Sequence, residues 1–183
     1  MQDPRPQLAQ AVLVAVHLSK RRRLTLLECD RFLAAYGIPC ARRFAVAGGS
    51  GADRAAAELG FPVTLTIETK DRRESATGLA NHTALGDAIT TLYADADQHD
   101  PTLMFYVSPT PTAGTTVRFE IPTGAPTVSD VTGHDAVFNP LVARLQAIVA
   151  DLPEVGPLEV TAILEPKGKV RVVDATIHFD LTR

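Results

Sequence analysis

The spacing of apolar residues predicts a chain in which helices and strands alternate. The strongest helix signal starts at Thr25, because Thr25 and Glu28 have the spacing of a capping box and Gly37 is a typical helix terminator. Apolar residues at helical spacing predict four more helices. These cover residues 7–19, 52–59, 83–94 and 136–152.

Residues 62–68 have the pattern of a strand with two unlike faces. Apolar side chains occupy every second position, so Thr64, Thr66 and Glu68 share the other face, which we expect to meet solvent or a ligand. Other strands are predicted for residues 42–48, 102–108, 115–122, 157–164 and 169–179. The last two are joined by "EPKG", a turn that favours an antiparallel hairpin.

The connections between these elements are rich in glycine, proline and charge. Gly48, Gly49 and Gly51 are expected to form a turn before the helix at residues 52–59. Residues 70–78 are expected to be a charged connection, and residues 122–135 to be irregular or a further hairpin. The mixture of helices and mostly antiparallel strands indicates an α+β fold.

Composition and charge exclude several classes of protein. The chain has 183 residues, enough for one large core or two small lobes, and its net charge of −3 does not favour a nucleic acid partner. No apolar run approaches the roughly 20 residues that a membrane span needs. Cys29 and Cys40 lack metal-ligand spacing and are expected to be reduced thiols, which fits a cytoplasmic protein.

Three segments carry a resemblance to a known family. They are "LLECDRFLAAYGIPCARRFAVA" at residues 26–47, "AAAELGFPVTLTI" at residues 55–67 and "LVARLQAIVADLPEVGPLEVTAILEPKGKVRVVDATI" at residues 141–177. In order and spacing they are similar to the ATP-grasp domain of ADP-forming acyl-CoA synthetases, relatives of the succinyl-CoA synthetase beta subunit. The resemblance implies one ATP-grasp-like domain over residues 1–183, with α+β lobes at about 1–100 and 101–183 that clamp ATP in the family.

The resemblance also implies a nucleotide site, in which ATP phosphates meet the polar face of residues 62–68. Thr66 stands where the family carries a lysine that contacts these phosphates, and the family's glycine-rich segment has no counterpart here. The remaining candidates for nucleotide binding are Lys70, Arg118 and Glu120, although Arg118 and Glu120 also fit a plain surface ion pair.

A magnesium site is the second feature that the resemblance implies. Glu159 and Thr161 replace an Asp and an Asn that lie two apart on a strand and help to hold magnesium in the family. Asp174 matches a further acid of the family and completes the candidate metal site with Glu159. Both acids also fit solvated strand residues. ATP and Mg²⁺ are therefore the implied cofactors.

Three functions are compatible with this sequence. The leading hypothesis is a degenerate ATP-grasp domain, a pseudoenzyme without catalytic residues that binds a nucleotide or another subunit. The second is an active, ADP-forming, ATP-dependent acyl-CoA ligase subunit that needs a separate CoA-binding partner. The third is a structural interaction module without nucleotide. A CoA-binding subunit and a second copy of the chain are the partners that these hypotheses imply.

Overall fold

The chain folds into two compact units, each with its own sheet and core. The structure is a computed structural model that describes residues 4–70, 72–94, 96, 103–121, 129–130 (backbone alone), 136–166 and 168–180. The terminal unit joins Met1–Cys40 to Ala113–Arg183, and the central unit is Ala41–Thr112. Each unit combines helices with an antiparallel sheet, so the expected α+β class is confirmed.

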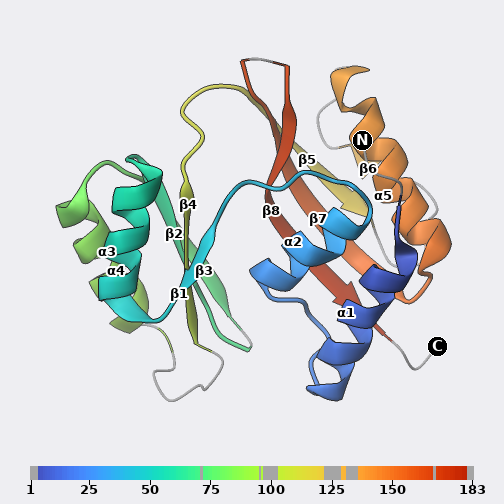
Figure 1. The fold of residues 1–183 in the computed structure, drawn as a ribbon, viewed down its shortest axis with the longest axis horizontal. Coiled ribbons are helices and arrows are strands. Elements are labelled where there is room, and N and C mark those ends of the chain that lie inside the picture. Colours follow the sequence, from blue (N-terminus) through green and yellow to red (C-terminus); the bar gives the residue numbers. More distant parts are fainter. Residues whose placement is uncertain are drawn as a thin grey trace. The chain divides into compact units, whose positions relative to one another are not determined.

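The central unit is a four-stranded antiparallel sheet covered by two helices (Figure 1). Its strand order is β1-β4-β2-β3, and buried residues of both helices share one apolar core with the sheet. The elements are β1 (Phe44–Val46), α3 (Gly48–Leu59), β2 (Val63–Glu68), β3 (Arg73–Leu79), α4 (His82–Ala94) and β4 (Met104–Pro109).

The terminal unit has a second four-stranded sheet, in the order β6-β5-β7-β8. Three helices cover one face of it, and their apolar residues form a larger core with the inward side chains of β5, β7 and β8. The elements are α1 (Pro6–Leu18), α2 (Leu26–Ala35), β5 (Thr115–Ile121), β6 (Ser129–Asp130), η1 (Ala136–Phe138), α5 (Asn139–Asp151), β7 (Val155–Leu164) and β8 (Val170–Phe179).

The N-terminal segment belongs with the C-terminal strands. On one side of α2 the amide of Leu24 donates to the carbonyl of Ile177 at 3.0 Å, and on the other the amide of Val172 donates to the carbonyl of Pro39 at 2.8 Å. These bonds attach the chain on both sides of α2 to β8. The predicted lobe boundary near residue 100 differs from this division, because the first 40 residues bury their apolar stripes against the late strands.

Most predicted elements are confirmed, including the capping box. The side chain of Thr25 accepts a hydrogen bond from the amide of Glu28, and the Glu28 carboxylate accepts one from the amide of Thr25 at 2.8 Å. Of the residues 122–135, the structure describes 129–130, where β6 pairs with β5; the rest of that segment lies outside the described residues. None of the described helices combines the length and the apolar character that crossing a membrane requires.

Two predicted connections are wrong. The glycines at 48, 49 and 51 belong to the first turn of α3 rather than to a turn before it. At Gly51 a Cβ atom would stand 2.9 Å from the Cβ of Val46, so glycine permits the close approach of β1. Residues 73–79 form β3 rather than a charged connection. Backbone pairing with β2 makes this strand, and its mostly polar sequence gives no apolar alternation.

Candidate functional site

The polar face of the sheet in the terminal unit gathers three of the predicted site residues. Arg118 on β5 donates from Nη2 to the Glu159 carboxylate at 2.7 Å, and its Nε lies 3.0 Å from Glu120 Oε1. Glu120 and Glu159 are direct cross-strand neighbours, so Arg118 neutralises two like charges that would otherwise repel. About half of each side chain is exposed, and such pairs contribute little to stability.

Asp174 lies on the same face, further across the sheet. Arg118 pairs with Thr161 of β7, and Thr161 pairs with Asp174 of β8, so these three residues form one cross-strand row. Neighbouring strands are about 5 Å apart, which puts Asp174 on the order of 10 Å from Arg118 along this row. Thr161 therefore separates the two charged residues.

In this arrangement Glu159, one of the two predicted magnesium ligands, is already engaged by an arginine. Magnesium binds through oxygen atoms in near-octahedral geometry, usually from one or two carboxylates with water or phosphate. Here Glu120 and Glu159 already hold the guanidinium of Arg118. Within the described part of the chain, no three His, Cys, Asp or Glu side chains are grouped so that they could hold a metal ion.

The polar face of β2 in the central unit is filled by side-chain pairs. Thr66 is only 6 % exposed, and its Oγ1 lies 2.7 Å from the Oγ of Ser75 on β3. Glu68 is 2 % exposed and accepts from Arg73 Nη2 at 2.7 Å. The expectation that Thr66 and Glu68 meet solvent is therefore wrong, because β3 supplies a partner to each of them.

Lys70 and Thr66 lie in the central unit, whereas Arg118, Glu120, Glu159 and Asp174 lie in the terminal unit. Lys70 follows the end of β2 and is exposed. The structure thus brings Arg118, Glu120 and Glu159 into direct contact and places Asp174 on their face of the sheet.

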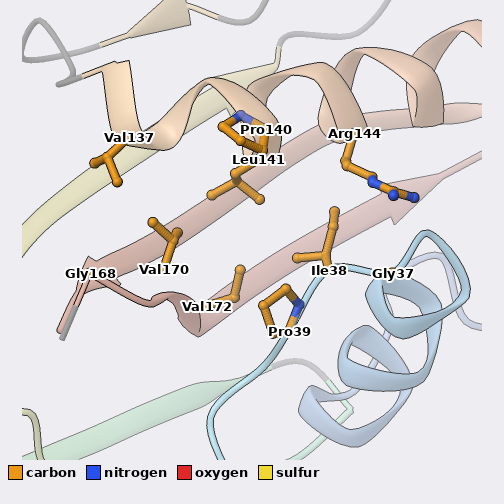
Figure 2. Close-up of a pocket in the computed structure, with 10 residues that line it drawn as sticks. All are labelled: Gly37, Ile38, Pro39, Val137, Pro140, Leu141, Arg144, Gly168, Val170 and Val172. Carbon is orange, nitrogen blue, oxygen red and sulfur yellow. The ribbon is translucent and has the colours of Figure 1, made fainter. Parts of the chain in front are cut away.

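A pocket of about 220 Å³ is a further feature of the terminal unit, and sequence reasoning missed it (Figure 2). Its walls come from the segment after α2, from η1 and α5, and from the β7–β8 turn with the start of β8. Most of the lining is apolar, and Arg144 of α5 is its one charged side chain among the described residues. Its apolar members look like core positions in the sequence, so no local pattern distinguishes them.

Comparison with solved structures gives the class of protein: the chain has an ATP-grasp fold. The sequence matches no protein-family model, and no curated protein matches it significantly. A dinucleotide-forming acetyl-coenzyme A synthetase of Ca. Korarchaeum cryptofilum, in complex with coenzyme A, Ca-AMPCP and HgCl+, is similar with a TM-score of 0.77 and 16% identity. That similarity covers 94% of this chain and 100% of the other.

Two further structures agree on this fold. PH1788 of Pyrococcus horikoshii is similar with a TM-score of 0.74 and 16% identity, over 95% of this chain and 98% of that protein. A RimK domain ATP-grasp protein of Sphaerobacter thermophilus is similar with a TM-score of 0.58 and 17% identity, over 85% of this chain and 59% of that protein. The expected ATP-grasp-like fold, related to that of the ADP-forming acyl-CoA synthetases, is therefore confirmed.

Proposed function

We propose that this chain is a degenerate ATP-grasp domain that binds a nucleotide or a partner subunit without catalysing phosphoryl transfer. The observation that carries the proposal is the environment of Thr66. This residue stands where the resembling family has its phosphate-binding lysine, and here it is a buried neutral hydroxyl paired with Ser75. The position therefore offers no positive charge to a phosphate.

Phosphoryl transfer depends on cationic groups that stabilise the charge developing on the phosphate oxygens. The loss of the strand lysine removes one such group. The contacts of Arg118 support the same proposal, because this cation is shared between two carboxylates. The proposed nucleotide contacts are Thr66, Lys70, Arg118 and Glu120, and we propose that binding does not depend on magnesium ligation by Glu159 or Asp174.

The partner and the compartment belong to the same proposal. The Korarchaeum protein was solved with coenzyme A and a nucleotide analogue. By analogy, a CoA-binding subunit is the partner that an ATP-grasp domain of this kind would serve, and a second copy of the chain is the alternative. Cys29 and Cys40 are both unbridged thiols, which supports a reducing, cytoplasmic environment.

Calorimetric titration with ATP, with and without Mg²⁺, tests this proposal when it is combined with a phosphate-release assay. We expect saturable binding, a similar Kd in both conditions and no phosphate release. Binding with phosphate release would instead establish an active ligase subunit. If millimolar ATP gives neither heat nor a thermal shift, the chain does not bind the nucleotide, and the structural interaction module would be the remaining hypothesis.

The variant Thr66→Lys tests the role of the β2 position directly. A charge-assisted hydrogen bond is worth about 1.5–3 kcal/mol, so the variant should bind ATP about tenfold more tightly or better. Thr64→Lys is the matched control, because Thr64 lies on the same face of β2 two residues earlier. An equal gain in both variants would show a general effect of charge and would contradict the role of Thr66.

A further inference from the structure

The pocket in Figure 2 is distinct from the proposed nucleotide contacts. Val172 of β8 is fully buried and pairs across the strands with Ala162, so both belong to the face that the helices cover. Arg118, Glu159 and Asp174 lie on the opposite face of the same sheet. A ligand in the pocket would therefore meet none of the side chains in the polar row.

The lining of the pocket is suited to an apolar group. Ile38 and Pro39 from the segment after α2, Leu141 from α5, and Val170 and Val172 from β8 surround it. Figure 2 shows these side chains directed toward the same space from three separate elements. Apolar surface of this kind favours the transfer of hydrocarbon from water.

Arg144 adds a fixed positive charge at one end of the pocket (Figure 2). Its Nη1 donates to the carbonyl of Tyr36 at 2.7 Å, which holds the guanidinium in place. A guanidinium has five N–H donors, and within the described part of the chain no carboxylate pairs with Arg144. The remaining donors are therefore available to an anion.

We propose that this pocket binds a small organic monocarboxylate, with the carboxylate on Arg144 and the hydrocarbon among the valine, leucine and proline side chains. Arginine binds carboxylates through two parallel hydrogen bonds, and an apolar wall strengthens such contacts. A cavity of 150 Å³ holds benzene, so about 220 Å³ corresponds to roughly nine non-hydrogen atoms. Hexanoate, with eight, is the probe that this volume selects.

Arg144 also has a purely structural interpretation, because the carbonyl that it contacts is at the C-terminal end of α2. Cations stabilise this end of a helix, and an arginine there needs no ligand. The two interpretations differ in what they predict for a charged and a neutral ligand of the same length. Only the proposed site distinguishes hexanoate from hexanol.

The ligand series is measured on the full chain by calorimetry and by ¹³C methyl NMR of Ile38, Val170 and Val172. We expect saturable binding of hexanoate with shifts at these methyl groups, at least tenfold weaker binding of hexanol, and none of hexylamine. Acetate should bind more weakly than hexanoate because it leaves the apolar walls uncovered. Equal binding of hexanol, or shifts elsewhere in the chain, would overturn the proposal.

Two variants separate the charge from the apolar wall. Arg144→Met should weaken hexanoate binding about tenfold or more, whereas Arg31→Met, which removes an exposed charge from α2, should leave it unchanged. Val170→Phe should fill the space and abolish binding independently of Arg144. Thermal unfolding confirms that each variant is folded. Unchanged binding in a folded Val170→Phe variant would contradict the proposal even if Arg144→Met failed to fold.

Discussion

Glu28 is the residue at which several interactions meet at the start of α2. Its carboxylate accepts two hydrogen bonds from Arg21, each at 2.8 Å, and it also caps the helix through the amide and hydroxyl of Thr25. Burial of Glu28 opposes its ionisation, but the bonds from Arg21 and Thr25 outweigh this, so the pKa of the carboxyl lies below its ordinary value. The charged form is therefore the one that the fold stabilises.

Glu28→Gln should lower the free energy of unfolding by about 1–2 kcal/mol at pH 7, because it removes the charge but keeps a side chain that can cap. The folded-state pKa is depressed, so this contribution is complete above the ordinary pKa of 4.5 and is lost as the pH falls through the folded-state value. Urea unfolding at pH 7 and at pH 3 measures the effect.

The difference between wild type and Glu28→Gln should therefore shrink in acid. Glu58→Gln is the control, because Glu58 pairs with Arg42 on an exposed surface and should change stability by well under 1 kcal/mol. A difference between wild type and Glu28→Gln that stays constant from pH 7 to pH 3 would contradict the role given to the Glu28 charge.

At the same scale, Thr25 and Thr66 show what a sequence can predict. The partner of Thr25 is three residues away, so the capping box is visible in the local pattern. The partner of Thr66 is Ser75, on a strand whose sequence "RESATGL" carries no apolar alternation. The burial of Thr66 depends on that neighbouring strand, and no pattern within residues 62–68 indicates it.

At the scale of elements, α3 shows how backbone approach selects a residue. Gly51 is buried in the first turns of α3, and a Cβ atom there would lie 2.9 Å from the Cβ of Val46 on β1. By contrast, Gly86 is exposed within α4 and has nothing within 4 Å of the same position. Close packing therefore favours glycine at position 51 but not at position 86.

Gly51→Ala should lower the free energy of unfolding by about 1 kcal/mol or more, because the steric cost of roughly 1–3 kcal/mol exceeds the gain in helix propensity. Gly86→Ala should instead raise it by about 0.5–1 kcal/mol, since only the propensity changes. Chemical unfolding of the two variants checks both signs. Stabilisation by Gly51→Ala would mean that β1 moves away from α3 at no cost.

Elements with an apolar stripe were predictable because burial of one face places apolar residues at a regular spacing in the sequence. This holds for α1, for α4 and for β5, in which Val117, Phe119 and Ile121 are buried. It fails for the first turn of α3, where three glycines suggest a loop. There Gly51 is placed by its close approach to Val46 of β1, which no local pattern indicates.

At the scale of the whole molecule, the chain leaves the terminal unit and returns to it. Residues 1–40 contribute α1 and α2 to a core completed by strands more than 70 positions later, and the central unit is inserted between them. Local patterns predict each element but not which elements share a core. The predicted boundary between the lobes, near residue 100, is based on the order of the elements along the chain. The observed division into two units instead depends on which elements pack against one another.

This division predicts a reciprocal pattern of local stability. Leu13 of α1 and Leu65 of β2 are both fully buried, the first in the core of the terminal unit and the second in that of the central unit. Each substitution to alanine should lower the free energy of unfolding of its unit by about 2–5 kcal/mol, which accelerates exchange through unfolding about thirtyfold or more.

Leu13→Ala should therefore accelerate amide hydrogen exchange in β5, β7 and β8, and Leu65→Ala in β2, β3 and β4. Mass spectrometry of peptides from the two units measures both, and equal acceleration everywhere would mean that the chain unfolds as one cooperative body.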